Sequence, residues 1–421
     1  MKLIKAIRGM NDVLAEDAKI KASIENVCQQ VFTSFYFQKI ETPIVEKTEL
    51  FARSIGADTD IVSKEMYTFT DRNGDSLTLR PEGTACCVRA GIEHGLFYNQ
   101  QQRLWYSGPM FRHERPQKGR YRQFYQIGAE SYGWATPDID AELIAMSNAI
   151  WQALGLTGIE LQINSLGSTQ ARQHYKEALV AFLEPLRDQL DNDSKRRLES
   201  NPLRILDSKV PETQKLLLDA PNLSDYLDDE SVQEFENLQA YLVAQEINFV
   251  INPRLVRGLD YYNKTVFEWV YPNLGAQATV CAGGRYDGLV EQLGGKATPA
   301  VGFAMGVERL IELIKDQNKQ LSQNVPDIYF ISVGQTSRLT ALKIAQNLRQ
   351  VGKIVQLHCG EGSLKNQIKR ADKSGATVAL ILGEDEINNE QIIIKPLLSR
   401  NEQQSIAQSE LLTSLDTLLK V

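Results

Sequence analysis

Residues 104–132, LWYSGPMFRHERPQKGRYRQFYQIGAESY, decide the fold of this chain. Two runs rich in apolar and aromatic residues, Leu104–Glu114 and Tyr121–Tyr132, are predicted as long strands, and only the polar stretch Arg115–Arg120 separates them. Strands joined by so short a connection must pair antiparallel. The hairpin therefore favours an α+β domain with a largely antiparallel sheet over a doubly wound parallel one.

The segments on both sides of the hairpin extend this pattern. Apolar spacing predicts an amphipathic helix over Ala18–Phe35. The next segment, Ile40–Val45, is predicted as a strand at an edge or interface, because Pro43 cannot donate to a strand ladder. Further strands are predicted at 76–79, 159–164, 249–252, 266–270, 279–282 and 300–305, and further helices at 138–154 and 286–293. These elements assign residues 1–325 to one α+β domain.

Two segments differ from this pattern. Residues 169–244 are charged and helix-rich with few strand signals, which predicts a helical insertion. An RNA contact and a solvated excursion without a ligand explain it equally well. After a polar break at Gln317–Pro326, strands are predicted at 327–333, 355–358, 377–382 and 391–395, and helices at 340–351, 363–374 and 408–419. This alternation predicts a small α/β domain over residues 326–421.

Composition narrows the class of protein. The chain has 421 residues, of which 43% are hydrophobic and 24% charged, as in soluble globular proteins of two or three domains. No apolar run approaches the roughly 20 residues that cross a bilayer, and the N-terminus has no signal-peptide core. We therefore expect a cytoplasmic protein without a membrane segment. The five cysteines and four histidines are scattered, which argues against a disulfide framework and a zinc site.

A basic window stands out against the net charge of −7. Between Arg103 and Arg122 there is one acid, Glu114, and the following cations: Arg103, Arg112, Arg115, Lys118, Arg120 and Arg122. Arginine grips phosphate oxygens bidentately, so the window predicts an anion-binding patch. A solvated basic loop is the alternative explanation.

Strand parity favours a binding site over that alternative. On Tyr121–Tyr132, a period of two places Phe124, Gln126, Gly128 and Glu130 on one face. An aromatic ring, an amide, a glycine and a carboxylate do not make an apolar core face. We expect a binding floor here, with Arg112 on the partner strand pointing to the same side, although a satisfied buried polar network would have the same pattern.

Three further clusters carry glycine and arginine, and the first two also carry tyrosine: residues 257–262 (RGLDYY), 283–288 (GGRYDG) and 302–310 (GFAMGVERL). Glycine lets a ligand approach the backbone closely, and tyrosine offers a ring and a hydroxyl together. The third cluster is predicted as a strand that runs into a helix with Arg309 in its first turn. The sequence has neither a P-loop nor a dinucleotide fingerprint, so ATP binding would depend on arginines arranged on the sheet.

With these residues in view, the chain resembles the class II aminoacyl-tRNA synthetases and, among them, the histidyl-tRNA synthetase family. Residues 41–46 (ETPIVE) resemble motif 1, the dimer-interface strand, residues 111–124 resemble motif 2, and residues 302–309 resemble motif 3. Residues 257–262, 283–288 and 79–84 (LRPEGT) resemble signatures of the histidine-specific family, and the likeness runs through essentially the whole chain. The resemblance implies a catalytic domain with an antiparallel sheet, a helical insertion and a C-terminal anticodon-binding domain.

The resemblance also implies a role for each site residue. Arg112 and Arg257 would hold the α-phosphate of ATP as the catalytic pair, Arg120 and Arg309 would contact the γ-phosphate region, and adenine would lie between Phe124 and Arg309. The implied ATP-binding set is Arg112, Glu114, Arg120, Phe124 and Arg309. The implied histidine-binding set is Glu82, Thr84, Arg112, Gln126, Glu130, Arg257, Tyr261, Tyr262 and Tyr286.

Within that second set, Glu82, Thr84 and Gln126 would bind the amino and carboxylate ends of histidine. Glu130 and Tyr262 would bond to the two imidazole nitrogens, with Tyr286 completing the pocket. Such a pocket rejects side chains that lack these nitrogens because its own polar groups would be left unpaired.

The implied partners are L-histidine, ATP with Mg²⁺, and tRNA(His). Arg115, Gln117 and Lys118 at the hairpin tip would meet the acceptor end of the tRNA, and residues 326–421 would read its anticodon. The motif 1 proline implies a homodimer. No metal site made of protein side chains alone is expected.

Two alternatives share this fold. One is a non-catalytic regulatory paralogue of histidine biosynthesis, which would be expected to lose the catalytic arginines or the anticodon-binding domain. The other is a class II synthetase for a different amino acid, which the Glu130 and Tyr262 pair disfavours. The amino acid that drives ATP turnover distinguishes all three.

Overall fold

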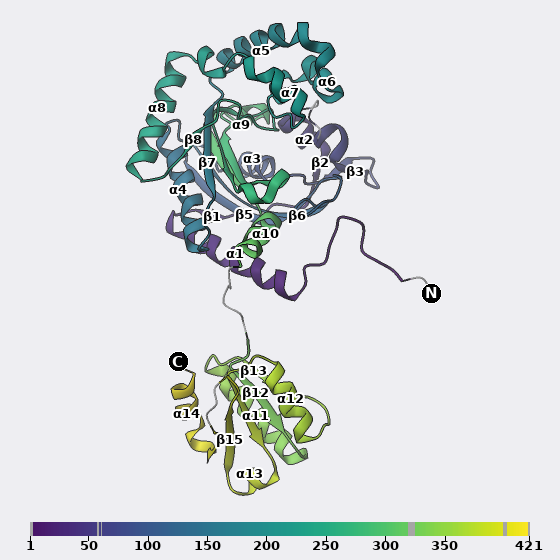
Figure 1. Ribbon diagram of the computed structural model, residues 1–421, viewed down its shortest axis with the longest axis vertical. Coiled ribbons are helices and arrows are strands. Elements are labelled where there is room, and N and C mark those ends of the chain that lie inside the picture. The colour runs from purple at the N-terminus through teal and green to yellow at the C-terminus, as the bar shows by residue number, and fades with distance from the viewer. Residues whose placement is uncertain (1–2, 57–58, 60, 319–324, 399–401, 420–421) are drawn as a thin grey trace. The chain divides into compact units, whose positions relative to one another are not determined.

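The hairpin predicted at the centre of the chain is present. Strands β5 (Gln102–Phe111) and β6 (Gln123–Tyr132) pair antiparallel along their whole length, from Gln102 opposite Tyr132 to Phe111 opposite Gln123. The computed structural model (Figure 1) describes residues 3–56, 59, 61–318, 325–398 and 402–419. The chain divides into two compact units, residues 1–321 and 322–421, and each is described separately below.

The first unit is built on an eight-stranded sheet in the order β1-β5-β6-β11-β10-β9-β7-β8. Neighbouring strands from β5 to β7 pair antiparallel, and only the edge strands β1 and β8 pair parallel. The remaining strands of this sheet are β1 (Gln38–Lys39), β7 (Glu160–Ser165), β8 (Val250–Ile251), β9 (Asn263–Val270), β10 (Thr279–Arg285) and β11 (Ala300–Gly306). The α+β class predicted from the hairpin is confirmed.

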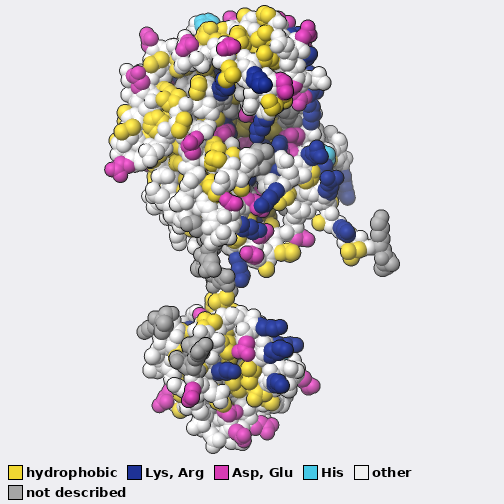
Figure 2. Space-filling view, viewed as in Figure 1, with side chains coloured by type: hydrophobic (Ala, Val, Ile, Leu, Met, Phe, Trp, Pro, Cys, Tyr) yellow, Lys and Arg dark blue, Asp and Glu magenta, His cyan; other side chains and the backbone are white. Residues whose placement is uncertain are grey.

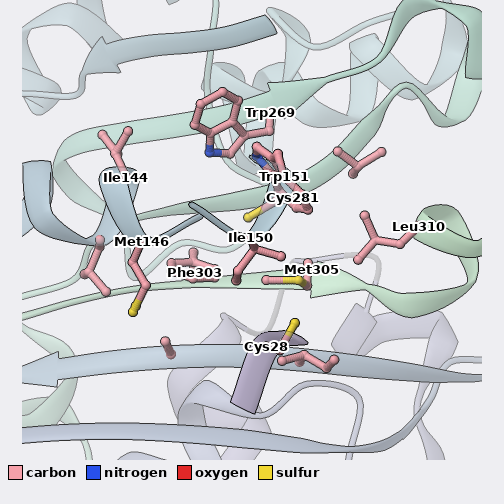
Figure 3. Close-up of a cluster of buried hydrophobic side chains, with 14 of the residues drawn as sticks. Cys28, Ile144, Met146, Ile150, Trp151, Trp269, Cys281, Phe303, Met305 and Leu310 are labelled. Atoms are coloured by element: carbon pink, nitrogen blue, oxygen red, sulfur yellow. The ribbon is translucent and has the colours of Figure 1, made fainter. Parts of the chain in front are cut away.

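One face of this sheet is covered by α1 (Ala15–Ser34), α4 (Asp138–Ala153) and α10 (Val307–Asp316). The side chains between the helices and the sheet form a buried apolar core, part of which is shown in Figure 3. Ile150 and Trp151 of α4 meet Trp269 and Phe303 of the sheet there. Each large apolar side chain buried in this way stabilises the fold by about 1.5–3 kcal/mol.

The opposite face carries α3 (Thr84–Glu93), α9 (Leu289–Gln292) and the first three helices of residues 169–244. The four helices of this segment are α5 (Thr169–Leu183), α6 (Asn192–Ser200), α7 (Pro211–Leu216) and α8 (Asp229–Ala244). The last of them, α8, packs through Leu238 and Leu242 into the core beside α4. Three of them begin at a side chain that caps the first turn, namely Ser168, Asp191 and Asp228. The helical segment predicted from charge and composition thus shares a hydrophobic cluster with this face of the sheet.

A small sheet in the order β2-β4-β3 lies beside α2 (Thr48–Ile55). It consists of β2 (Val45–Lys47), β3 (Tyr67–Thr70) and β4 (Ser76–Leu79). The prediction of one strand over Ile40–Val45 is wrong, because residues 40–44 form no ladder and strands β1 and β2 flank them. Pro43 lacks a donor, so the chain leaves the first sheet before it and enters the second after it.

The second unit has a five-stranded mixed sheet in the order β13-β12-β14-β15-β16. Its strands are β12 (Ile328–Ser332), β13 (Val355–Leu357), β14 (Val378–Leu382), β15 (Gln391–Pro396) and β16 (Gln404–Ala407). Its helices are α11 (Gln335–Gln350), α12 (Leu364–Lys373), α13 (Glu384–Asn388) and α14 (Leu411–Leu418). Helices α11 and α14 pack on one face and α12 on the other, as the alternating side chains of β12 require.

The sequence patterns predicted every element of this unit except α13 and β16. The polar break at Gln317–Pro326 lies largely outside the described residues, which resume at residue 325. Short π- and 3-10 turns complete the chain at Ile61–Glu65, Glu184–Gln189, Pro202–Ile205, Leu217–Asp219, Leu223–Tyr226, Pro272–Gln277 and Gln408–Glu410. In the described part of the chain, no helix is both long and apolar enough to cross a membrane.

Candidate active site

A cavity of about 380 Å³ opens on the face of the large sheet opposite α1, α4 and α10. Eleven of the predicted site residues line it: Glu82, Thr84, Arg112, Glu114, Arg120, Phe124, Gln126, Arg257, Tyr261, Tyr262 and Arg309. These residues come from β6, α3, α10 and the loops between the elements, so segments far apart in the sequence meet here. The face seen in Figure 2 carries Lys and Arg side chains around a hollow in this unit.

One part of the cavity is lined by arginines. The Arg112 Nε donates to the carbonyl oxygen of Pro81 at 2.9 Å, and its guanidinium lies 5.3 Å from the centre of the Phe124 ring. Arg309 donates to the carbonyl oxygen of Thr279 at 2.6 Å, and Arg120 pairs with the buried carboxylate of Glu114. The ring of Phe124 is thus covered by Arg112 in this chain, while the proposal that adenine lies between Phe124 and Arg309 stays a prediction.

The arginines repel one another. Burial and the positive charges of Arg120 and Arg112 lower the pKa of Arg309 to about 10. Burial likewise lowers the pKa of Arg112. A cluster of like charges in a partly enclosed cavity is unfavourable until a polyanion binds, and charge-assisted hydrogen bonds to phosphate oxygens then replace the repulsion.

A second part of the cavity rests on a buried carboxylate. Glu130 is 1% exposed and accepts hydrogen bonds from Thr84 Oγ1 at 2.7 Å, Tyr286 Oη at 2.5 Å and Tyr106 Oη at 3.4 Å. Thr84 and Tyr106 line the cavity, whereas Glu130 and Tyr286 lie one layer beneath its surface. Burial raises the pKa of Glu130 to about 8.

Two glycines make room for this layer. A Cβ atom on Gly128 would collide with the Tyr106 ring, which lies across the strand from it, and a Cβ on Gly302 would collide with the Glu130 carboxylate. Glycine at both positions therefore allows the carboxylate and the phenol to sit against the sheet. The parity predicted for β6 is confirmed, because Ile127 and Ala129 face the apolar core instead.

Two further hydrogen-bond acceptors, the side chains of Glu82 and Gln126, line the cavity. Glu82 is buried and accepts backbone hydrogen bonds from Thr84 at 2.5 Å and Ala85 at 2.9 Å, at the start of α3. Burial nevertheless raises its pKa. Within the described residues, the buried Gln126 Oε1 has no hydrogen-bond partner. A buried acceptor left unpaired costs about 1–3 kcal/mol, so a donor from a ligand would be stabilised there.

The loop 257–262 closes another wall. Arg257 pairs with Glu268 and lies 5.3 Å from the centre of the Tyr262 ring. Tyr261 and Tyr262 are both buried, and their rings lie 4.7 Å apart. The Tyr286 ring stands edge-on to both of them.

The hairpin tip lies outside the cavity. Arg115, Gln117 and Lys118 are exposed, and Lys118 pairs with Glu312 of α10 at 2.7 Å. Arg285, from the second glycine cluster, also points elsewhere. It is 2% exposed and binds Asp140 through two hydrogen bonds, so its role is structural.

Several cavity residues were not predicted: Glu65, Tyr106, Arg204, Asp207, Glu268 and Glu308. Tyr106 had a signal, because it lies opposite Gly128 on the paired strand and so shares the face of Glu130. Arg204 and Asp207 come from the helical segment 169–244, and no local pattern indicates that this segment reaches the cavity.

Comparison with known proteins covers nearly the whole chain. A family model described as histidyl-tRNA synthetase matches residues 9–310, and one described as an anticodon binding domain matches residues 327–418. A histidine–tRNA ligase from Hydrogenovibrio crunogenus (strain DSM 25203 / XCL-2) is 57% identical over 420 residues, which is 99% of each chain.

Solved structures agree in fold. The apo histidyl-tRNA synthetase of S. aureus is 36% identical, with a TM-score of 0.82, over 99% of this chain and 100% of the other. An ATP phosphoribosyltransferase regulatory subunit/histidyl-tRNA synthetase from Bacillus halodurans C is 22% identical, with a TM-score of 0.62, over 88% and 97%. At that identity the second likeness concerns the fold alone.

Proposed function

The chain belongs to the histidyl-tRNA synthetase family, and on that premise we propose how its residues carry out the reaction. Its function is that of a histidine–tRNA ligase, which activates L-histidine with ATP and transfers it to tRNA. The observation that carries this conclusion is the 57% identity to a histidine–tRNA ligase along 99% of both chains. The regulatory paralogue is disfavoured, because the chain keeps the anticodon-binding region and the arginines of the cavity.

We propose that the arginines of the cavity bind ATP. Arg112 and Arg257 would hold the α-phosphate from two sides, and Arg309 with Arg120 would contact the γ-phosphate region. Burial and repulsion by Arg120 and Arg112 lower the pKa of Arg309, and this supports the assignment because a bound triphosphate would offset the repulsion. Phe124 offers a ring on which adenine stacks once Arg112 engages phosphate.

The polar part of the cavity suits histidine. Glu82 and Gln126 offer acceptors for its α-ammonium group, and the unpaired Oε1 of Gln126 supports that role. Tyr262 would bond one imidazole nitrogen. Glu130 is proposed for the other nitrogen, and its carboxylate is one hydrogen bond from the cavity through Thr84 and Tyr106. Tyr261 and Tyr286 would complete the pocket around the ring.

The chemistry requires positioning and charge stabilisation. A carboxylate oxygen of histidine attacks the α-phosphorus in line, the bond from that phosphorus to the bridging oxygen breaks, and pyrophosphate leaves. A terminal ribose hydroxyl of tRNA then attacks the acyl carbon and releases AMP. Neither step needs a covalent nucleophile from the protein. Arg112 and Arg257 would stabilise the charge that develops on the α-phosphate.

We propose that Mg²⁺ enters with ATP. Among the described residues, no group of three His, Cys, Asp or Glu side chains forms a metal site. Mg²⁺ in nucleotide sites is bound mainly by phosphates and water with one or two carboxylates, and Glu114 lines the cavity. When bound, the ion would neutralise charge on the phosphate oxygens.

The tRNA would contact both units. Arg115, Gln117 and Lys118, exposed at the hairpin tip, are proposed to meet the acceptor end. Residues 1–325 are proposed to form the catalytic domain, and residues 326–421 are proposed to form a separate domain that reads the anticodon of tRNA(His). Lys365, Lys369 and Arg370 are exposed on α12, where Figure 2 shows a group of basic side chains, and they would suit the phosphates of the tRNA.

On family grounds we also propose a homodimer whose interface lies near Pro43, where Ile44 and Val45 are exposed. We propose a cytoplasmic location on the same grounds.

ATP–pyrophosphate exchange tests the activation step. The purified chain is assayed with Mg²⁺ and each of the twenty amino acids in the absence of tRNA. Exchange with histidine alone is expected. Exchange with another amino acid would overturn the assignment of Glu130 and Tyr262, and no exchange from folded protein would favour the regulatory paralogue.

A further inference from the structure

The helical segment 169–244 lies behind the loop that we propose binds histidine. The loop's apolar residues Leu255 and Val256 share a hydrophobic cluster with Leu179 and Leu183 of α5. Arg254, at the start of the loop, donates to the carbonyl oxygen of Leu217 at 3.3 Å. One side of the loop faces the cavity, and the other side packs against the helical segment.

Two polar contacts fix the histidine end of the loop. Arg172 of α5 donates through Nη1 to the carbonyl oxygen of Tyr262. Asn201, directly after α6, donates through Nδ2 to the carboxylate of Asp260 at 2.5 Å. Both side chains line a crevice of about 200 Å³ whose opposite wall is formed by Arg257, Asp260 and Tyr262.

These contacts restrain groups that face the cavity. Tyr262 lies beneath the Arg257 guanidinium, and its ring packs against Tyr261 and Tyr286. A hydrogen bond to the Tyr262 main chain therefore sets where its hydroxyl lies. The bond is of the charge-assisted kind, because its donor is a guanidinium that lies beside Asp260.

We propose that Arg172 and Asn201 are positioning residues for histidine, so that the helical segment acts as the rear support of the amino-acid pocket. Arg172 touches no substrate in this account and acts through Tyr262. The inference rests on the proposed function of the cavity. It assigns a role to a segment for which the sequence left an RNA contact and a solvated excursion equally open.

The test compares Arg172→Met, which keeps the length of the side chain, with Arg172→Lys, which restores a cation. Gln173→Ala is the matched control, because Gln173 is the next residue of α5, exposed, and on the same crevice. The full-length proteins are assayed by pyrophosphate exchange for KM and kcat, and by calorimetry for histidine binding.

Arg172→Met is expected to raise the KM and Kd for histidine about tenfold, while the KM for ATP changes less than about twofold. Arg172→Lys should recover part of this loss. Asn201→Ala gives a smaller loss of the same kind and replaces Arg172→Met if that variant does not fold. Histidine constants within twofold of Gln173→Ala, or an equal rise in the KM for ATP, would overturn the proposal. If the unsubstituted chain shows no histidine-dependent exchange, that result counts against the proposed function. Calorimetric measurement of histidine binding by the variants would then still test the role of Arg172.

Discussion

Arg257 is the single residue whose removal best separates chemistry from binding. It pairs with Glu268 and is proposed to stabilise the charge that develops on the α-phosphate. Arg257→Ala is expected to lower the rate of adenylate formation about 100- to 1000-fold, the loss typical of a missing transition-state donor. Histidine affinity should fall much less. Single-turnover adenylate formation and equilibrium histidine binding measure the two quantities.

The pair with Glu268 supplies the control for that experiment. Glu268→Gln removes the negative partner and keeps the guanidinium, so it should retain most of the adenylation rate. Comparable losses of rate and of histidine affinity in Arg257→Ala would show that Arg257 serves binding and transition state alike, contrary to its proposed role.

Glu130 predicts a pH dependence of stability. Burial raises its pKa from 4.5 to about 8. The folded chain therefore holds a proton that the unfolded chain releases between these values, and the free energy of unfolding contributed by this group falls as pH rises from about 4.5 to about 8. Release of one proton on unfolding makes the free energy of unfolding fall by about 1.4 kcal/mol per pH unit. Glu130→Gln has a neutral side chain at every pH, so this contribution should be absent from the variant.

Urea denaturation of both proteins at pH 5, 6, 7 and 8 measures the difference. A carboxyl group whose raised pKa does not depend on Glu130, such as Asp140, contributes equally to both proteins and cancels. Stability curves that run parallel across this range would show that Glu130 is ionised throughout.

Single residues also mark where sequence reasoning succeeded and where it ended. The period of two on β6 predicted which side chains face the cavity, because a buried sheet face leaves no freedom in register. It did not distinguish the wall of the cavity from the layer beneath, where Glu130 and Tyr286 lie. Arg285 carried the same Gly-Arg-Tyr signal as the cavity loops, yet its partner Asp140 is 145 positions away, and no local pattern predicts such a pair.

At the scale of a single element, strand β11 carries two glycines with different surroundings. Gly302 and Gly306 lie on the same face of β11, two alternations apart. A methyl group on Gly302 would collide with Glu130 and with the carbonyl oxygen of Ala129, whereas one on Gly306 would meet nothing nearer than 3.7 Å. Gly302→Ala should reduce the free energy of unfolding by about 1–3 kcal/mol and weaken histidine binding.

Gly306→Ala is the control on the same strand and should change stability by no more than about 0.5 kcal/mol. Thermal melts and histidine titrations of both variants measure these effects. Equal stability of the two variants would mean that β11 shifts to accommodate the methyl group, and that Glu130 is not held against the sheet.

The elements themselves were largely predictable. All strands of the large sheet except β1 had a run of apolar or alternating residues, and the short hairpin connection set the antiparallel class. Strand β3 and the edge strand β16 were missed, because short, exposed strands depend on their neighbours more than on their own residues. The edge or interface strand predicted over Ile40–Val45 was wrong, because Pro43 lies between β1 and β2 and belongs to neither.

At the scale of the whole molecule, the chain combines an α+β unit and a smaller α/β unit, for which we propose different functions. The large antiparallel sheet carries the cavity that we propose binds ATP and histidine, whereas the second unit has its own sheet and its own two apolar cores. Each unit buries its own core, so the second can be removed without exposing the first core to water. On the proposed assignment, activation of histidine requires only the cavity of the first unit, while charging requires tRNA to be held as well.

Removal of residues 322–421 is therefore expected to separate the two half-reactions. Histidine-dependent pyrophosphate exchange by residues 1–321 should stay within about threefold of the full chain, because every cavity residue is retained. Charging of tRNA(His) should fall by about a hundredfold or more, since two linked contacts bind that much more tightly than one. Light scattering must show the same oligomeric state for both proteins, because the segment around Pro43 remains in the truncated chain. Intact charging by the truncated chain would refute the anticodon assignment, and loss of exchange with an unchanged oligomeric state would mean that the second unit supports the cavity directly.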